Sequence, residues 1–491
     1  MTPTLRLPYA RKSQLLRALL QVLLLVLLSL SQPLVFLYEA RAQGVEAQAP
    51  SAVEQLIAEM TPEQRVAQLF LVTFGGSQAP DDSLVARLVS DLRVGGVVLR
   101  ASNGNYQNSG STAAELVALT NQLQALALRS SQQGEGTGPF IPLFIAMDLF
   151  SSDALLADGL PQNGFTRVPS QMAIGATWNP ANAETVGRIV GQELAAIGVN
   201  MLLGPALDVV DSAAPDQSSH LGTRTFGGSP YWVGLMGKAF VRGVAAGSTG
   251  RVATIARHFP GLGSSDRRPD EEIATVQKPL LSLQQEDLPP FYAIVNPNGP
   301  VTDTRSVDGL MTTNVRYRAL QGNIRPTTRP ISLDAQSLPT LLGQPELLGW
   351  RQAGGVLVSA ELGAPSLRRF HQQQTGSFPA RTVARDALNA GNDLLFLADF
   401  ALEDDWTARL QNIEQTVQFF AEQYQSDPAF ASRVDESLRR LLGLKLRLYG
   451  DDFGVAATPL PDPTTLDPSP LQTVEHVNAV SQIAREAATL L

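Results

Sequence analysis

Short apolar runs alternate with longer amphipathic stretches along most of this chain. The apolar runs are rich in Val, Ile and Leu, and there are eight of them: LFLVTF (69–74), GGVVL (95–99), PLFIAMD (142–148), VNMLLGPALDV (199–209), VATIARHF (252–259), GLMTTNV (309–315), GGVLVSA (354–360) and NDLLFLA (392–398). Continuous runs of this kind are typical of parallel strands that are buried on both faces, with helices between them. Eight such units predict an α/β fold, a (β/α)8 TIM barrel.

The stretches between the runs carry the signals of helices. PANAETVGRIVGQELAAIG has apolar residues at helical spacing, with Pro180 near its start and Gly198 past its end. The barrel is expected to extend over residues 51–450 and to close with the helix ASRVDESLRRLLGLKLRLYG. Residues 451–472 are rich in Pro, Asp and Thr and read as a linker. Residues 473–491 are expected to form a helix that begins a further, truncated domain.

The N-terminal segment 1–42 has the composition of a targeting signal. Basic residues precede a long apolar run that reaches Leu37, and Ala40-Arg41-Ala42 has the shape of a cleavage site. The alternative is an uncleaved anchor, since the run is near the roughly 20 residues that span a bilayer. Both readings predict an extracytoplasmic protein, either secreted or anchored at the cell surface, that meets the membrane only through this segment.

Composition narrows the chemistry further. The chain has no cysteine, which excludes disulfides, thiolate metal sites and cysteine nucleophiles and suits an oxidising compartment. The net charge is −9 without a long basic run, which argues against a nucleic-acid partner. Four scattered histidines do not predict a metal site, and no organic cofactor is implied.

In a (β/α)8 barrel the active site lies at the carboxyl ends of the strands. Polar residues at the ends of the predicted strands are therefore the candidates: Asp148, Asp208, Arg257, His258, Asn314, Glu361 and Asp399. Asp208 has two readings that remain open, as a ligand-contacting residue or as one that orients neighbouring loops.

Several motifs occur in a recognisable order: MTPEQRVAQLFLVTFGG, DLRVGGVVL, IPLFIAMD, the long FTRVPSQMAIGATWNPANAETVGRIVGQELAAIGVNMLLGPALDV, GTRTFGG and RHFPG. Together they resemble the N-terminal barrel of glycoside hydrolase family 3, and the likeness is greatest to its β-N-acetylhexosaminidase branch. The resemblance covers residues 52–450. The tail VEHVNAVSQIAREAATLL is similar to the opening of that family's second, α/β sandwich domain.

This resemblance implies a retaining glycosidase, whose nucleophile and acid/base groups lie about 5–5.5 Å apart. In the resembled branch the nucleophile is the Asp of a Ser/Thr-Asp-x-Leu motif that ends strand seven. Here VLVSAELG places Ala360 at that position, with Glu361 next to it. Because side chains alternate along a strand, Glu361 is expected to point away from the place of that Asp unless the strand end bulges.

The acid/base of the branch is a histidine paired with an Asp on the loop after strand five. In RHFPGLGSSDRRPDEE (257–272), Leu262 replaces the second histidine of the motif, and the Asp-Ser-His dyad falls on Arg268-Pro269-Asp270. Asp270, Glu271 and Glu272 are the candidate acids, with Asp266 as a further one. A solvated carboxyl there would be ionised at pH 7 and would be a poor acid. The alternative reading is a solvated rim loop.

The sugar-binding residues of the family are partly matched. Asp148 and Arg224 stand where the resemblance places substrate-contacting residues, and His258 matches the family's histidine. Arg257 stands where the family has lysine, which keeps the charge but changes the geometry. The segment LFSSDALL after Asp148 lacks the family's Glu-Gly-Gly-Arg, so one expected arginine is missing.

Two functions of different classes follow. One is an exported β-N-acetylhexosaminidase or β-glycosidase that hydrolyses O-glycosidic bonds, with Glu361 as nucleophile and a loop carboxyl as acid/base. The other is an inactive relative that binds saccharide or scaffolds a complex, because Ala360 removes the group that a covalent mechanism needs. A third possibility is inverting hydrolysis, in which water attacks directly between carboxyls about 6.5–9.5 Å apart.

Overall fold

The computed structural model describes residues 51–132, 138–150, 159–211, 221–295, 306–460 and 471–488. The candidate targeting segment 1–42 and residues 461–470 of the predicted linker lie outside these residues. No helix in the described part of the chain is long and apolar enough to cross a membrane. Residues from Ala52 onward cluster as one unit.

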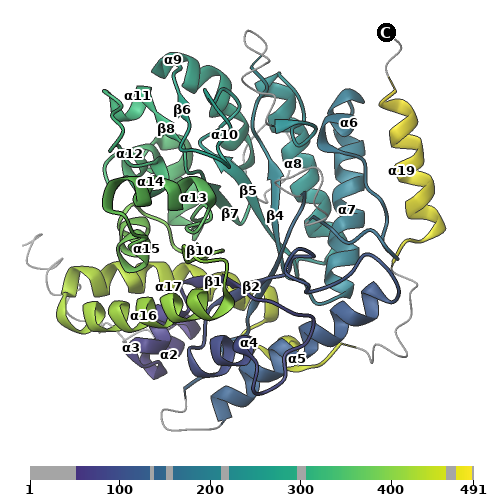
Figure 1. Ribbon diagram of the computed structural model, residues 1–491. Coiled ribbons are helices and arrows are strands. Elements are labelled where there is room, and N and C mark those ends of the chain that lie inside the picture. Colours follow the sequence, from purple (N-terminus) through teal and green to yellow (C-terminus); the bar gives the residue numbers. More distant parts are fainter. Residues whose placement is uncertain are drawn as a thin grey trace, which may run out of the picture. The chain divides into compact units, whose positions relative to one another are not determined.

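Eight parallel strands form the centre of this unit (Figure 1). They follow the order β10-β1-β2-β3-β4-β5-β7-β9, and a parallel bridge between Val358 and Leu394 joins the two ends of the sheet into a barrel. Each strand falls within one of the eight predicted runs, so the (β/α)8 prediction is confirmed. The strands are β1 (Phe70–Thr73), β2 (Gly96–Val98), β3 (Phe144–Asp148), β4 (Met201–Ala206), β5 (Ala253–Phe259), β7 (Gly309–Thr312), β9 (Val356–Val358) and β10 (Leu395–Leu397).

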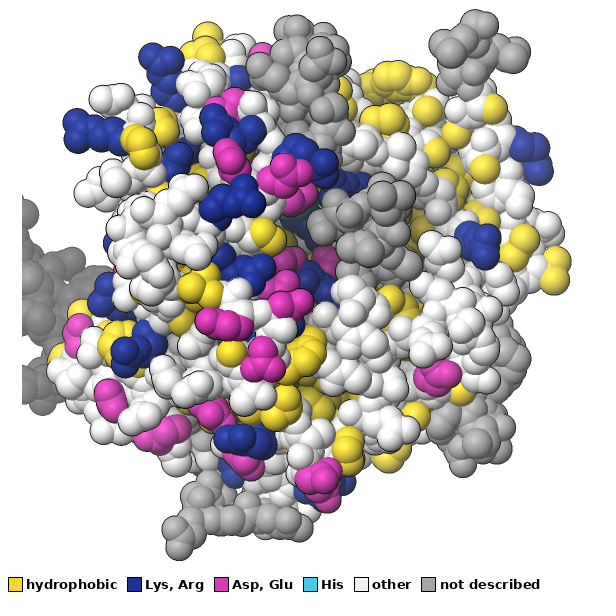
Figure 2. Space-filling view, in the orientation of Figure 1, with side chains coloured by type: hydrophobic (Ala, Val, Ile, Leu, Met, Phe, Trp, Pro, Cys, Tyr) yellow, Lys and Arg dark blue, Asp and Glu magenta, His cyan; other side chains and the backbone are white. Residues whose placement is uncertain are grey.

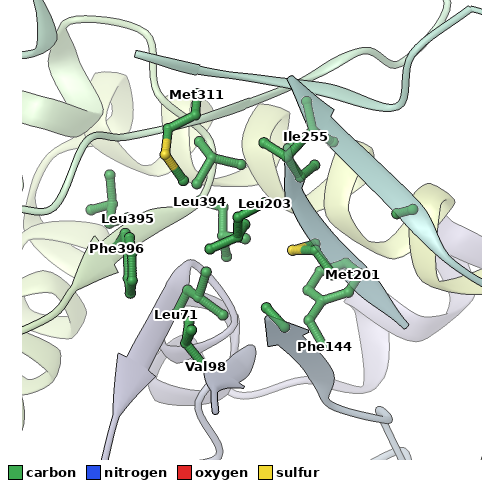
Figure 3. Close-up of a cluster of buried hydrophobic side chains, with 14 of the residues drawn as sticks. Leu71, Val98, Phe144, Met201, Leu203, Ile255, Met311, Leu394, Leu395 and Phe396 are labelled. Atoms are coloured by element: carbon green, nitrogen blue, oxygen red, sulfur yellow. The ribbon is translucent and has the colours of Figure 1, made fainter. Parts of the chain in front are cut away.

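Apolar side chains from β1, β2, β3, β4, β5, β7 and β10 or their flanks form a buried cluster (Figure 3). Leu71, Phe144 and Ile255 lie in this cluster and are fully buried. Outward-facing residues of the strands are buried as well, beneath the helices. Burial on both faces explains why the strands appear in the sequence as continuous apolar runs rather than as alternating ones.

Helices surround the barrel (Figure 1). The predicted helix at 180–198 is α7, in which the side chain of Asn179 caps the first turn and Gly198 follows the end with a positive φ of 77°. The predicted closing helix is α17, which Asp427 caps. The longer helices are α2 (Ala52–Glu59), α5 (Thr112–Gln132), α7 (Pro180–Ala196), α8 (Pro230–Gly247), α13 (Pro345–Gln352), α14 (Pro365–Thr375), α15 (Ala380–Asn389), α16 (Trp406–Ser426) and α17 (Pro428–Tyr449). The shorter ones include α3 (Pro62–Ala67), α6 (Gln171–Ala176), α10 (Pro289–Val295), α11 (Arg318–Gln321) and α12 (Ser337–Leu342).

A buried carboxylate links α17 to the amino end of β10. Asp393 accepts hydrogen bonds from Arg351 at 2.9 Å, from Arg433 at 3.3 Å and from Ser437 at 2.9 Å. Although burial raises the pKa of Asp393, the guanidinium groups, Arg351 above all, lower it to about 2. The carboxylate is therefore charged and fully satisfied, which stabilises the closure of the barrel.

Two features lie beyond the barrel itself. A two-stranded parallel sheet, β6 (Thr275–Val276) and β8 (Arg316–Tyr317), joins the loops that follow β5 and β7, and the sequence did not predict it. The helix expected after residue 473 is α19 (Val474–Glu486). Glu193 of α7 holds this helix in place. It accepts a hydrogen bond from the backbone N–H of Gln472 at 2.9 Å and lies 3.3 Å from Nδ1 of His476.

Candidate active site

Four charged side chains meet at the carboxyl ends of the strands. Asp148, at the end of β3, is 5% exposed and accepts hydrogen bonds from Arg257 of β5 at 2.5 Å and from Arg100 at 3.2 Å. Arg100 follows β2 and also donates to the carboxylate of Glu361 at 2.5 Å. Asp148, Arg257, Arg100 and Glu361 thus form one continuous chain of ion pairs, called the mouth network below.

Glu361 reaches this network because the backbone after β9 is no longer an extended strand. The strand ends at Val358, so the predicted alternation of side chains does not govern residues 360 and 361. Asn314 donates to the backbone carbonyl of Glu361 at 2.8 Å, and Ser332 in turn donates to Asn314 at 2.6 Å. These bonds fix the turn that directs Glu361 toward Arg100.

Ala360 lies beside Glu361 and is 7% exposed. Its backbone N–H donates to the hydroxyl of Thr312 on β7 at 3.1 Å. The position that the family resemblance assigns to a nucleophile is therefore well ordered but carries only a methyl group. Glu361 is the carboxylate of this loop that enters the mouth network.

Burial and opposing charges act together on the mouth network. Desolvation raises the pKa of Glu361, Arg100 lowers it, and the carboxylates of Asp148 and Asp399 raise it again; the net direction is upward. Burial alone would lower the pKa of Arg100, but the carboxylates of Glu361 and Asp148 raise it above its ordinary value. Arg100 therefore stays charged and keeps two carboxylates close together.

A second pair holds the histidine of the site. Asp208, just after β4, is fully buried; one carboxylate oxygen lies 2.8 Å from Nδ1 of His258 and the other accepts the backbone N–H of Leu262 at 2.9 Å. His258 is partly exposed toward the mouth, with 27% of its side chain accessible. Of the two readings left open for Asp208, these contacts favour the one in which it orients His258 and the start of the following loop.

Arg224 lies near these groups. Burial lowers the pKa of Arg224 and the positive charge of Arg257 adds to that, whereas the carboxylates of Asp270 and Asp208 raise it. Charge–charge effects fall off with distance, so Arg224, Arg257, Asp208 and Asp270 share one neighbourhood, in which Asp270 is exposed. Among the candidate acids of the loop, Asp270 is thereby linked to the predicted sugar-binding residues.

The other two candidate acids face the rim. Glu271 is exposed and lies 3.4 Å from Arg268, while Glu272 pairs with Arg267 at 3.1 Å and with Arg369 of α14 at 3.6 Å. The structure therefore brings Asp148, Arg257 and Glu361 into one network and places His258, Arg224 and Asp270 near it. Glu271 and Glu272 stand apart in ion pairs of their own, in keeping with the solvated-loop reading for these two residues.

Sequence reasoning did not select Arg100. The signal was present, because Arg100 directly follows the second apolar run and so stands at a strand end like the other candidates. Arg409 of α16 was also not selected; it binds Asp399 at 3.0 Å beside the same mouth. No group of three or more His, Asp or Glu side chains in the described ranges could hold a metal ion.

The arrangement suits a ligand with many hydroxyl groups. Carboxylates accept hydrogen bonds from hydroxyls, and guanidinium and imidazole N–H groups donate to their oxygens. A parallel barrel with such groups gathered at the carboxyl ends of its strands is the architecture of a (β/α)8 enzyme or of a close relative of one.

The chain belongs to glycosyl hydrolase family 3: the model of the family's N-terminal domain matches residues 61–444. It is 26% identical over 377 residues to beta-hexosaminidase A of Pseudoalteromonas piscicida, covering 74% of this chain and 55% of that protein. It is 28% identical over 369 residues to a beta-hexosaminidase of Nitrosomonas eutropha, covering 71% and 90%.

Solved structures agree. A family 3 beta-N-acetylglucosaminidase from Paenibacillus superposes with a TM-score of 0.69 at 26% identity, over 88% of this chain and 70% of that one. The chain spans little more than half the length of the Pseudoalteromonas relative and 59% of a beta-N-acetylglucosaminidase/beta-glucosidase of Cellulomonas fimi.

Proposed function

We propose that this chain is a β-N-acetylhexosaminidase-like glycosidase domain that hydrolyses O-glycosidic bonds of β-linked amino sugars or related β-glycosides. The activities for which the relatives are named, beta-hexosaminidase and beta-N-acetylglucosaminidase, support the substrate class. The observation that carries the proposal is the position of Glu361: its carboxylate joins Asp148 through Arg100 at the mouth of the barrel. The loop after β9 thus supplies a carboxylate although residue 360 is alanine.

In the proposed mechanism the sugar hydroxyls bind Asp148, Arg224 and His258. A carboxylate oxygen of Glu361 attacks the anomeric carbon and forms a glycosyl ester, while the bond to the aglycone oxygen breaks and that oxygen takes a proton from Asp270. Water then attacks the anomeric carbon, returns a proton to Asp270 and releases Glu361. Arg100 opposes the net upward shift of the pKa of Glu361, and its hydrogen bond occupies a carboxylate oxygen that the attack would need, which predicts slow turnover.

The test is release of a chromophore from aryl N-acetyl-β-glucosaminide and aryl β-glucoside by the purified protein. Glu361→Gln is expected to abolish the activity, because the amide cannot attack. Glu59→Gln is the matched control, since Glu59 is exposed on α2, far from the strand ends. Equal activity in Glu361→Gln and the parent would remove Glu361 from the mechanism. An assay that resolves the anomer of the first product would then decide between retaining and inverting hydrolysis.

The second candidate function is a saccharide-binding domain without catalysis. Ala360 favours this function, because a methyl group at the position that the resemblance assigns to the nucleophile cannot attack the anomeric carbon. In this second function Glu361 only stabilises the mouth network, and its hydrogen bond with Arg100 stays in place while the saccharide binds and leaves. A parent protein that releases no chromophore but binds N-acetyl-β-glucosaminides in calorimetry would support this function over the first.

We further propose that the protein acts outside the cytoplasm, with residues 1–42 as a cleaved signal or as an anchor. The basic start, the apolar run to Leu37 and Ala40-Arg41-Ala42 support this. Mass measurement of the protein from fractionated cells tests it. Loss of the first 42 residues supports a signal, and an intact chain in the membrane fraction supports an anchor. An intact chain in the cytosolic fraction contradicts both.

A further inference from the structure

A large polar pocket lies on the rim of the catalytic face, beside the mouth network and separate from it. It has a volume of about 870 Å³. Its walls are the loop after β5 with β6, the segment from β8 through α11 to residue 326, and one face of α14. Pockets of this size hold ligands of several rings. We call it the rim pocket.

The charge of the rim pocket is unbalanced. Two carboxylates line it, Asp266 and Glu272, against five guanidinium groups: Arg267, Arg316, Arg318, Arg325 and Arg369. The protein as a whole is acidic, with a net charge of −9, so an excess of positive charge in one pocket runs against its overall balance. Figure 2 shows Lys and Arg side chains gathered in this area, over α11, β8 and α14.

The two carboxylates are already engaged. Asp266 accepts the backbone N–H of Thr275 at 2.8 Å and binds its neighbour Arg267 at 3.1 Å. Glu272 is shared between Arg267 and Arg369. Asp266 therefore holds the loop after β5 together, Glu272 joins that loop to α14, and the two acids neutralise only the two arginines that they touch.

The other three arginines have no carboxylate partner among the described residues. Arg316 donates only to backbone carbonyls, those of Thr328 at 2.6 Å and Pro326 at 2.9 Å, and its guanidinium lies over the ring of Phe370. Arg318 and Arg325 are exposed and form no ion pair with the described part of the chain. Burial lowers the pKa of Arg316, and the charge of Arg267 lowers it further, as expected where positive charges repel one another.

We propose that the rim pocket binds oxyanion groups, carboxylate or phosphate, carried by the saccharide that occupies the barrel mouth. Guanidinium groups bind both oxyanions through paired N–H donors, and three of them in one pocket match a ligand with more than one negative charge. The proposal rests on the proposed saccharide function. It specifies further that the preferred saccharide substrate is anionic.

The location supports a role in substrate choice. α14 begins four residues after Glu361, and the pocket's other wall is the loop that carries Asp270. A chain bound with one sugar at the mouth network would extend across this rim. An oxyanion there would also attract Arg267 and Arg369, the two partners of Glu272, and so would couple ligand binding to the loop.

Direct binding at low salt tests the proposal without relying on activity. The probes are trigalacturonate for carboxylates, pyrophosphate for phosphates and chitotriose as a neutral saccharide. In the double variant Arg318→Gln/Arg325→Gln the affinity for the anionic probe is expected to fall about tenfold, as for loss of two charge-assisted contacts, and chitotriose binding is expected to stay unchanged. Arg318→Lys/Arg325→Lys should retain most of the affinity, because it keeps the charge.

The matched control is Arg129→Gln/Arg439→Gln, which removes the same charge from exposed positions on α5 and α17. It is expected to change the affinity less than twofold. An equal loss in both double variants, or no binding of either anion by the parent, would overturn the proposal. Trigalacturonate binding without pyrophosphate binding assigns the pocket to carboxylates, and the reverse assigns it to phosphates. Anion binding without chitotriose binding would leave the rim pocket standing and count against the proposed hexosaminidase function.

Discussion

Glu361 follows β9 and Asp148 ends β3, yet one guanidinium, that of Arg100, bonds both carboxylates, at 2.5 Å and 3.2 Å. Arg257 donates a hydrogen bond to the other carboxylate oxygen of Asp148. A carboxylate in the barrel mouth therefore depends on a cation that follows a third strand, β2.

Replacing Arg100 with methionine is expected to destabilise the protein and to impair Glu361. Two carboxylates would lose a buried partner, which costs about 3 kcal/mol in the free energy of unfolding. The pKa of Glu361 would rise further, since Arg100 is the cation that lowers it. Urea unfolding and the pH profile of chromophore release would measure the two effects.

The control for Arg100 is Arg87→Met, which breaks an exposed pair with Glu414. That change is expected to cost about 0–1 kcal/mol. If Arg100→Met were no more destabilising than Arg87→Met, the mouth network would not contribute to stability.

Ala360→Asp is expected to create or increase hydrolysis of aryl N-acetyl-β-glucosaminide. Ala360 stands at the position that the family resemblance assigns to the nucleophile, and its backbone N–H is bonded to Thr312, so an added carboxylate would start from a defined place. Ala360→Asn is the control, because it has the same shape but cannot attack. A gain of about tenfold or more in kcat for Asp alone would show that position 360 limits catalysis. Equal rates in both variants would show that it does not.

The barrel could be predicted from the sequence because each of its strands is buried on both faces. Runs such as LFLVTF and VATIARHF are mostly apolar, which indicates burial on both faces. The end of each run then predicts where its strand ends. Asp148 and Arg257 were found by this route. Their partner Arg100 was not selected, although it follows the run GGVVL in the same way, because only a family motif or a spatial contact distinguishes one strand-end residue from another.

The direction of Glu361 could not be predicted, since it depends on where β9 ends. Strand alternation was the only available guide, and it fails because hydrogen bonds from Asn314 and Ser332 shape a turn after Val358. The rim pocket also had no local signal. Its arginines come from distant segments: the pairing of β6 with β8 brings Arg316 beside the loop that carries Arg267, and Glu272 links that loop to Arg369, more than 100 residues further along the chain.

Asp393→Asn is expected to lower the free energy of unfolding by about 3–5 kcal/mol. The amide would leave Arg351, Arg433 and Arg440 without their buried counter-charge at the base of the barrel. Because the pKa of Asp393 is lowered to about 2, its contribution is present above about pH 4 and is lost as the pH falls toward 2. Chemical denaturation at pH 7 measures the loss. Asp404→Asn, at a 92% exposed side chain paired with Arg409, should cost less than about 1 kcal/mol, and a similar cost at both sites would contradict the argument.

Asp287 should make the protein less stable as the pH rises from about 4 to 6. Its side chain is fully buried beneath the loop after β5; one carboxylate oxygen binds Lys278 at 2.9 Å and the other has no hydrogen-bond partner among the described residues. Burial raises the pKa of Asp287 to about 6, more than Lys278 lowers it. The folded state therefore holds a proton that the unfolded state releases near pH 4, and the free energy of unfolding falls across this window.

Asp287→Asn removes this titration, so its stability curve should be flatter than that of the parent between pH 4 and 6. Near pH 7 the variant should be the more stable of the two, by on the order of 2 kcal/mol. Lys278 keeps an ion pair in the variant, since Glu286 lies 2.9 Å away. Glu286→Gln is the control: it removes a partner of the same lysine at a half-exposed position, and it should flatten the parent's slope only slightly, because the charge of Glu286 raises the pKa of Asp287 less than burial does. Urea unfolding at pH 4, 5, 6 and 7 measures all three proteins. Parallel curves for the parent and Asp287→Asn would mean that the buried carboxyl does not titrate in this range.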